Sequence, residues 1–254
     1  MMMKFIKVEK FTSDPLVKIV TLNRPQVKNA FHPEMIAEIT SFFNSENQLG
    51  TSRLIILRGE GTAFCAGADL NWMKDMVNFS LEENKSDSIK LWNMFEAMQS
   101  CRVPVVGVAQ GAVFGGALGL LVACDYVFVE EKTQFCFSEV KLGLAPAIIS
   151  GFITQKIQDA FFRPLMISGE VFNSALAQKI GIAHQLFAEK LENADVVKTF
   201  SANGREAMQE TKKLLNGLLG NREKESCKSL CTQVIAERRV SIEGQERLKK
   251  FLNK

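Results

Sequence analysis

The chain has 254 residues, of which 46% are hydrophobic and 23% charged, and its formal net charge is +3 at pH 7. This composition predicts a globular protein with one large core and excludes a disordered or fibrous chain. The low net charge, without long basic runs, argues against nucleic acid as a partner.

Cysteine and histidine usage narrows the class further. The six cysteines show no C-x-x-C spacing, and the chain has only two histidines. We interpret the cysteines as reduced core thiols, and we expect no metal site and a cytoplasmic protein. The first residues lack the apolar stretch of a signal peptide.

The first half of the chain alternates the hydrophobic patterns of strands and helices. Residues 17–22 and 54–57 are apolar enough for strands, and an apolar stripe through 35–43 predicts a helix between them. A more polar helix is expected over 81–98, after a glycine-containing loop. This βαβ order is typical of α/β folds.

Residues 103–124 carry no charged side chain, and several glycines interrupt their apolar run. The stretch is long enough to span a bilayer, but its glycines, Pro104 and Gln110 favour a buried strand, a turn and a buried helix. We therefore expect no membrane span. Two short strands are expected next, over 126–129 and 134–137.

Beyond residue 147 the pattern becomes helical. The expected helices cover 148–157, 159–167, 174–180, 205–219 and 222–240. No repeat or low-complexity linker divides the chain. We expect a core with the active site over 1–200 and a helical oligomerisation region over 201–254.

Two turns of small residues, 65–68 and 114–117, each follow an apolar segment. If both lie at one sheet end, their exposed backbone N–H groups would stabilise negative charge on a ligand oxygen. Glycines at such turns also permit close packing of a helix on a strand, and spacing alone favours this packing interpretation.

Glu139 stands within an apolar run, between 135–137 and 142–144. Burial there would raise the pKa of its carboxyl and suit it to acid/base chemistry. The alternative is an exposed glutamate at a strand end beside Lys141, and the pattern does not choose between them.

Taken together, several short strings resemble the crotonase (enoyl-CoA hydratase/isomerase) superfamily over almost the whole chain. They are Leu22-Asn23-Arg24-Pro25, Asn29-Ala30, Phe64-Cys65-Ala66-Gly67-Ala68-Asp69-Leu70, Pro104-Val105-Val106, Gly115-Gly116, Ala123-Cys124-Asp125, and Glu139 with Leu142-Gly143-Leu144-Ala145-Pro146. The resemblance implies an α/β crotonase fold of repeated ββα units and an acyl-CoA thioester substrate. It also implies a homotrimer or homohexamer with a C-terminal trimerisation region, and no cofactor besides the coenzyme A that the substrate carries.

The resemblance also implies roles for single residues. The backbone N–H groups of Ala68 and Gly116 would form the oxyanion hole for the thioester carbonyl, and Glu139 would be the acid/base. The Ala66 carbonyl and the Leu70 backbone would contact the CoA adenine.

Further CoA contacts follow from the same resemblance. Ala30 would line the adenine pocket, Lys28 is a candidate for a phosphate contact, and Lys254 is a candidate for the C-terminal lysine that reaches CoA. A lysine in such a position is more often a solvated surface lysine, which is the alternative for Lys28.

Two-carboxylate hydratases of the superfamily have a second glutamate three residues after the oxyanion-hole glycine, where this chain has Gly119. We therefore expect one carboxyl to act alone, and room for a bulky or anionic acyl group beside Gly119. Trp72 and Met73 are candidates for the acyl pocket, with a core or interface role as the alternative. Glycine at 119, with segments 69–73 and 138–144, resembles bacterial methylglutaconyl-CoA hydratases.

That resemblance implies hydration of a branched enoyl-CoA, with carboxylated ones among the candidates. One acid/base also suits a Δ3/Δ2-enoyl-CoA isomerase, and a decarboxylase is an alternative for a carboxylated substrate. A non-catalytic acyl-CoA or RNA binder belongs to a different class. Because the basic residues of 212–239 are mixed with acidic ones, the pattern disfavours RNA.

Overall fold

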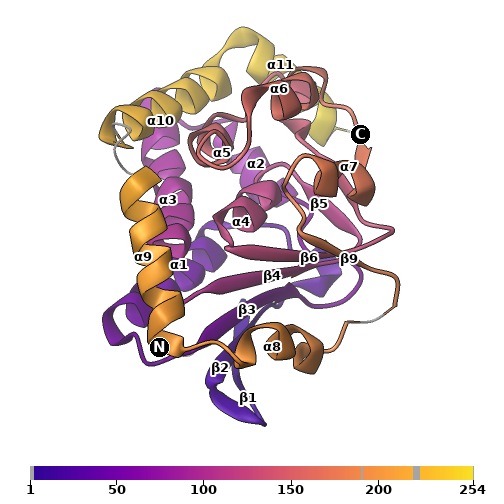
Figure 1. The fold of residues 1–254 in the computed structure, drawn as a ribbon. Helices are drawn as coiled ribbons and strands as arrows, with labels where there is room; N and C mark the ends of the chain where they lie inside the picture. Colours follow the sequence, from indigo (N-terminus) through magenta and orange to yellow (C-terminus); the bar gives the residue numbers. More distant parts are fainter. Residues whose placement is uncertain (1–2, 190, 220–223, 254) are drawn as a thin grey trace.

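The computed structural model describes residues 3–189, 191–219 and 224–253. Figure 1 shows a six-stranded sheet at its base, in the order β1-β2-β3-β4-β6-β9. The first two strands pair antiparallel, and every later pair in this sheet is parallel. The strands are β1 (Ile6–Phe11), β2 (Asp14–Leu22), β3 (Leu54–Gly59), β4 (Val105–Ala109), β6 (Tyr126–Glu130) and β9 (Gln185–Phe187).

Both faces of the central strands of this sheet are buried. Because successive side chains of a strand point to opposite faces, the apolar run of β3 supplies two cores. Ile55 packs in the larger cluster and Ile56 in the smaller one. The covering helices are α1 (Pro33–Leu49), α3 (Leu81–Ser100) and α4 (Ala117–Ala123) on the larger cluster, and α8 (Asn193–Ser201) on the smaller one.

A second, three-stranded sheet has the order β5-β7-β8. Its strands are β5 (Ala112–Phe114), β7 (Gln134–Cys136) and β8 (Phe172–Asn173). Residues 103–124 therefore hold two strands, in different sheets, where the sequence predicted one. The chain turns between β4 and β5 at Gly111, whose φ of 64° favours glycine. A bridge between Cys65 and Val113 then brings the segment after β3 alongside β5.

The remaining elements are mostly helical. They are η1 (Pro25–Val27), α2 (Leu70–Met76), η2 (Ser138–Leu142), α5 (Ala147–Ile153), α6 (Asp159–Ser168), α7 (Ser174–Lys179), α9 (Arg205–Leu219), α10 (Lys224–Val240) and α11 (Ile242–Leu252). The sequence patterns did not predict α2, α8 or α11. Of the predicted helix over 222–240, the first two residues lie outside the described part of the chain.

The C-terminal helices fold back over the core of their own chain. In Figure 1, α10 and α11 arch across the top of the molecule. Helix α10 packs on α3 and α5, and α11 packs on α2 and η2. Within the described ranges, no helix is both long enough and apolar enough to cross a membrane.

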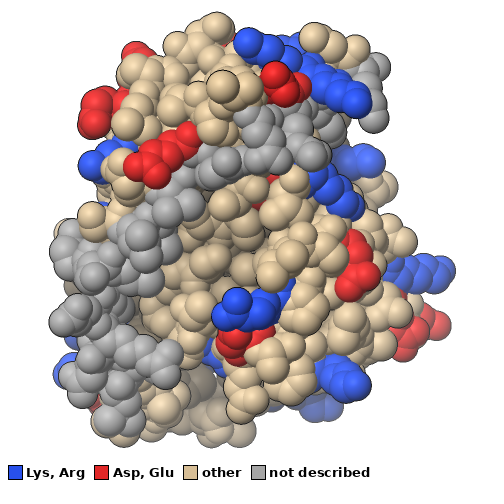
Figure 2. Space-filling view, turned by 90° about the horizontal axis from the view of Figure 1, so that it is seen from above, with Lys and Arg blue, Asp and Glu red and all other residues tan. Residues whose placement is uncertain are grey.

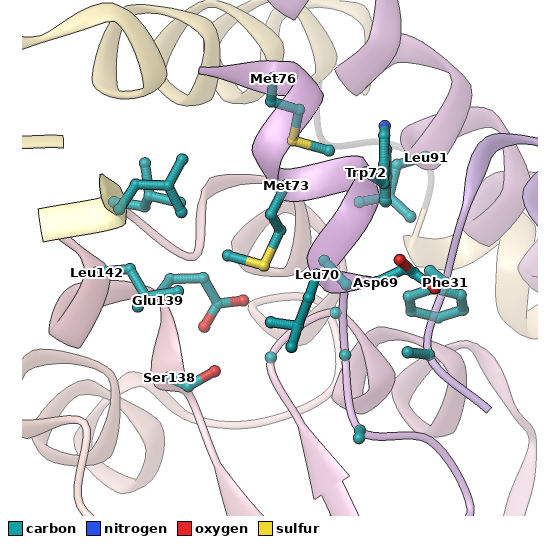
Figure 3. Close-up of a pocket in the computed structure, with 18 of the residues that line it drawn as sticks. Phe31, Asp69, Leu70, Trp72, Met73, Met76, Leu91, Ser138, Glu139 and Leu142 are labelled. Atoms are coloured by element: carbon teal, nitrogen blue, oxygen red, sulfur yellow. The ribbon is translucent and has the colours of Figure 1, made fainter. Parts of the chain in front are cut away.

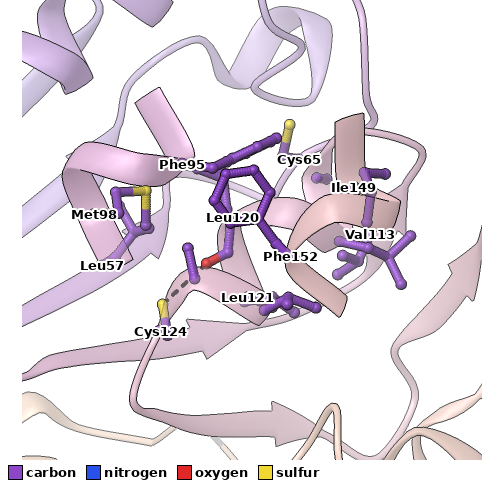
Figure 4. Packing of buried hydrophobic residues seen from close by; sticks show 14 of the residues in the cluster. Leu57, Cys65, Phe95, Met98, Val113, Leu120, Leu121, Cys124, Ile149 and Phe152 are labelled. Atoms are coloured by element: carbon purple, nitrogen blue, oxygen red, sulfur yellow. Dashed lines mark hydrogen bonds between the residues drawn. The ribbon is translucent and has the colours of Figure 1, made fainter. Parts of the chain in front are cut away.

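The centre of the larger core is built around α4. Phe95 of α3 and Phe152 of α5 meet beside this helix with ring centroids 5.5 Å apart in a T-shaped arrangement. Figure 4 shows both rings close to Leu120, whose carbonyl accepts a hydrogen bond from Cys124 Sγ at 3.2 Å. The helix that follows the second glycine turn thus packs against aromatic side chains from two other helices.

Candidate active site

A cavity of about 600 Å³ lies among α2, η2, α5, the glycine turns and the C-terminal helices. Among the described residues, the structure brings every predicted site residue except Gly119 to its wall. These residues are Lys28, Ala30, Ala66, Ala68, Leu70, Trp72, Met73, Gly116 and Glu139. Figure 3 shows the Glu139 carboxylate directed into the space below Met73 and beside Leu70.

The two glycine turns meet at this cavity. The turn at 65–68 is held by strand-like pairing, in which the Phe31 N–H donates to the Gly67 carbonyl at 2.7 Å. Gly67 itself has a φ of 98°. The second is fixed by the Gly115 N–H, which donates to the Cys136 carbonyl at 2.8 Å. A Cβ on Gly67 would lie 2.9 Å from the Phe114 carbonyl oxygen, so only glycine permits the two turns to approach so closely.

The residues after these glycines, Ala68 and Gly116, both line the cavity. Neither backbone N–H donates to an acceptor among the described residues. Unpaired N–H groups at a cavity wall are suited to stabilise charge on a ligand oxygen. The geometry thus favours the oxyanion interpretation of the two turns, whereas spacing alone favoured packing.

Glu139 is the carboxylate beside these turns. A Cβ on Gly115 would lie 3.4 Å from Glu139 Oε1. The other oxygen, Oε2, is buried and has no hydrogen-bond partner among the described residues. Burial raises the pKa of Glu139 from 4.5 to about 7. The exposed strand-end alternative is therefore wrong for this carboxyl, which is poised to exchange a proton near neutral pH.

Asp69 also lines the cavity, but it is committed to structure. Its Oδ1 accepts from the Asn71 N–H at 2.8 Å and caps α2, and its Oδ2 lies 2.8 Å from Arg24 Nη2. Burial alone would raise the pKa of this carboxyl, but the Arg24 and Asn71 hydrogen bonds lower it below its ordinary value. Asp69 is therefore held in place by the ion pair with Arg24 and by its capping of α2.

The residues predicted to contact CoA form one connected loop system. The Ala66 N–H donates to the Lys28 carbonyl at 2.9 Å, and Arg24 Nη1 donates to the Ala30 carbonyl at 2.6 Å. Leu70 is 52% exposed at the cavity mouth. These positions suit a ligand that enters from solvent, and their roles stay predictions. Lys254 lies outside the described residues.

The prediction that Gly119 borders the substrate pocket is wrong. Gly119 is buried within α4 and is not among the residues that line the cavity. A Cβ at this position would lie 2.4 Å from Cζ of Phe95. The absence of a side chain at 119 therefore makes room for an aromatic ring of the core rather than for an acyl group.

Other reactive side chains are accounted for by structure. His184 Nδ1 accepts a hydrogen bond from the Val127 N–H at 3.0 Å. Cys65 is buried, and this burial raises the pKa of its thiol to about 12. Neither group has the environment of an activated catalyst.

The sequence analysis missed the contribution of the C-terminal helices to the cavity. Ile235 and Arg239 of α10 and Leu248 of α11 line it. The apolar wall also includes Met76, Leu91, Leu142, Leu144, Ile148 and Ile149. Helical periodicity predicts that a face of 224–240 is buried, but the partner of that face depends on how the helices fold back, which no local pattern encodes.

The family model described as "Enoyl-CoA hydratase/isomerase" matches residues 14–251 of the chain. The chain belongs to this family. A crystal structure of an enoyl-CoA hydratase from Shewanella pealeana superimposes with a TM-score of 0.80 at 30% identity, covering 98% of this chain and 94% of the other. The crotonase fold implied by the sequence motifs is thereby confirmed.

Curated relatives in the enoyl-CoA hydratase/isomerase family differ in the reaction that their names state. The enoyl-CoA hydratase AFT6-1 of Alternaria alternata is 30% identical over 65% of this chain, and the match spans 53% of its length. A mitochondrial 3-hydroxyisobutyryl-CoA hydrolase of Xenopus laevis is 29% identical over 70% of this chain, with 46% of its own length covered. Family membership therefore supports a CoA thioester enzyme.

Proposed function

We propose that the chain hydrates an α,β-unsaturated acyl-CoA with Glu139 as a single acid/base. The observation that carries the proposal is the difference in environment between the two carboxylates that line the cavity. Among the described residues, Asp69 is locked to Arg24, whereas Glu139 has a raised pKa and an unpartnered oxygen. One carboxyl is thus available to move protons.

Glu139 alone can carry out both proton transfers of the hydration. The Glu139 carboxylate takes a proton from water as the water oxygen bonds to C3, and the C2=C3 electron pair moves toward the thioester oxygen. The N–H groups of Ala68 and Gly116 hold that oxygen as an enolate. The protonated Glu139 then returns its proton to C2. Removal of one oxyanion donor typically costs roughly a hundredfold or more, so these N–H groups would carry much of the acceleration. No cofactor is needed besides the CoA of the substrate.

A double-bond isomerase is the second candidate, because one carboxyl can also shuttle a proton between C2 and C4. Incubating the enzyme separately with a 2-enoyl-CoA and a 3-enoyl-CoA distinguishes the two. Water addition to the 2-enoyl-CoA, detected as a mass gain of one water, is the expected result. Migration of the double bond in the 3-enoyl-CoA, without hydration of either compound, would contradict it and establish the isomerase.

We extend the proposal to a branched, methylglutaconyl-type acyl group. The support is the apolar wall of the cavity of about 600 Å³ that holds Glu139, to which Met73, Leu144, Ile148 and Ile149 contribute. Rates of hydration across a panel of straight and branched enoyl-CoA substrates test this. Branched substrates should have the higher kcat/KM.

The pH dependence of hydration should report Glu139. Because the carboxylate form accepts the proton from water, kcat/KM should be low at pH 5.5 and rise through an inflection near the pKa of about 7. The measurement is the initial rate at low substrate concentration from pH 5.5 to 8.5, in buffers of constant ionic strength. A profile that falls across this range would show that another group accepts the proton.

We further propose a homotrimer or homohexamer in the cytoplasm. Several large apolar side chains are exposed on the single chain, including Leu214 and Leu215 of α9 and Ile242 at the start of α11. Such side chains favour burial against another subunit. The cysteines Cys65, Cys101, Cys124 and Cys136 are buried and unpaired, as in proteins of reducing compartments. Light scattering after size exclusion gives the mass of the assembly.

The class of RNA binders gains no support from the surface. On the face shown in Figure 2, Lys and Arg side chains are interspersed with Asp and Glu, and the coloured basic residues form no continuous patch. A basic, continuous track is the usual electrostatic footprint of nucleic-acid binding.

A further inference from the structure

The cavity holds a polar side chain to which the proposed hydration has so far given no role. Ser138, at the start of η2, lines the cavity beside Glu139. The residue is half-buried, and among the described residues no group pairs with its hydroxyl. Because a hydroxyl can both donate and accept hydrogen bonds, Ser138 Oγ is free to bind a molecule in the cavity.

This hydroxyl lies near the carboxylate that moves the protons. A Cβ on Gly115 would lie 3.2 Å from Ser138 Oγ and 3.4 Å from Glu139 Oε1, so both oxygens border the same point of the glycine turn. Figure 3 shows both side chains directed toward the space beside Leu70. The next residue, Gly116, supplies one N–H of the proposed oxyanion hole. The hydroxyl therefore borders the part of the cavity where the reacting carbons would lie.

Backbone hydrogen bonds hold the two side chains against the glycine turn. The Gly115 N–H donates to the Cys136 carbonyl at 2.8 Å, and the Leu144 N–H donates to the Glu139 carbonyl at 3.0 Å. Ser138 and Glu139 are neighbours within one short 3-10 helix. Hydroxyl and carboxylate are thus presented together, as the positioning of one small reactant requires.

The attacking water of the proposed reaction needs a second polar contact. A water held by the carboxylate alone can turn about that single hydrogen bond, whereas buried waters typically make about three. Besides Ser138, the labelled side chains around Glu139 in Figure 3 are the apolar Leu70, Met73 and Leu142. Position 119, where two-carboxylate hydratases have their other acid, carries no side chain and lies away from the cavity wall.

The other polar side chains of the described wall are paired or exposed. Asp69 pairs with Arg24, and Arg239 pairs with Asp87. Ser138 is therefore the uncharged polar group best placed to hold a water inside the cavity. The remaining polar wall residues are exposed to solvent: Gln26, Lys28, Asn71 and Lys74.

We propose that Ser138 holds the attacking water against Glu139. The inference rests on the proposed function, because it adds a second contact to the water of that hydration. During attack the water gives one proton to the Glu139 carboxylate and its oxygen bonds to C3, while its other O–H donates to Ser138 Oγ. Ser138 keeps its own proton throughout, and the new hydroxyl of the product stays bonded to it. Ser138 is thus a positioning residue rather than a second acid.

Replacement of Ser138 tests the inference by separating two reactions of one site. Ser138→Ala should lower kcat for hydration by roughly tenfold or more, while KM for the enoyl-CoA changes by less than about twofold. The variant should still exchange the C2 protons of butyryl-CoA in deuterium oxide at the wild-type rate, measured by mass spectrometry. That exchange needs Glu139 and the oxyanion hole but no attacking water. Ser138→Thr, which restores a hydroxyl, should recover most of the hydration rate.

The pH profile and a matched control distinguish positioning from damage to the site. In Ser138→Ala, the rise of kcat/KM should keep its inflection near the Glu139 pKa of about 7, because that carboxyl is unaltered. Ser100→Ala removes an exposed hydroxyl on α3 that donates to the Glu96 carbonyl, and it should leave both rates unchanged.

Each other outcome is informative. Hydration at the wild-type rate by Ser138→Ala, equal losses of hydration and exchange, or a shifted inflection would overturn the inference and leave the proposed function standing. A wild type that exchanges C2 protons but hydrates no enoyl-CoA would contradict the proposed function itself, and the inference with it.

Discussion

Replacement of Glu139 by glutamine should lower kcat for hydration by roughly two to four orders of magnitude, the usual contribution of a general acid/base. The amide has nearly the same shape, but it can neither accept a proton from water nor return one to C2. Substrate binding should persist, because the cavity wall and the N–H groups of Ala68 and Gly116 are unchanged. Trp72 lines the cavity, so quenching of tryptophan fluorescence by a saturated acyl-CoA can report that binding.

The stability of the same variant provides the control for misfolding. The pKa of Glu139 is about 7 in the folded chain and near 4.5 when unfolded, so folding favours the protonated form. The stability that this protonation contributes is therefore lost as pH rises through 7. Glu139→Gln should gain thermal stability relative to the wild type at pH 8 and little at pH 5. Retained turnover in a stable variant would remove Glu139 from the mechanism.

Several parts of the site were predictable because each part is a short, continuous segment of the sequence. The turn at 65–68 and the glycine pair at 115–116 each combine small residues with an apolar strand-like approach, and these patterns mark where backbone approaches a ligand. The apolar neighbours of Glu139 likewise indicated burial. Each of these patterns alone also fits a packing role. They indicated an active site only because they occur together with the family motifs.

The parts that could not be predicted depend on contacts far apart in the chain. Strand β5 is short and follows β4 closely, so its transfer to a second sheet leaves no mark in the hydrophobic pattern. The return of α10 over α3 places Arg239 beside Asp87 across a sequence separation of 152 residues. The packing role of Gly119 could not be predicted from the sequence either, because the ring beside it belongs to Phe95, on another helix.

Substitution of Gly119 by alanine should destabilise the protein by about 1–3 kcal/mol, the usual cost of overpacking a core. The added Cβ would lie 2.4, 2.6 and 2.9 Å from three ring carbons of Phe95, which is itself packed against Phe152. Thermal unfolding measures the effect, which should exceed that of Gly204→Ala. At Gly204 a Cβ would meet Ala207 Cβ at 3.5 Å, an ordinary van der Waals distance.

Gly119→Glu should be less stable still, and it should not become a better hydratase. The resemblance to two-carboxylate hydratases places their second glutamate at this position, but here the Phe95 ring fills the space that the carboxylate needs. A charged group forced into this apolar core would also lose its hydration without gaining a partner. Adding Phe95→Ala should recover part of the lost stability by relieving the overlap. A stable Gly119→Glu variant with raised kcat would show that the ring yields easily and that a second acid is compatible with this fold. We expect an unstable variant without raised kcat, because the Phe95 ring occupies the space that a second acid at position 119 would need.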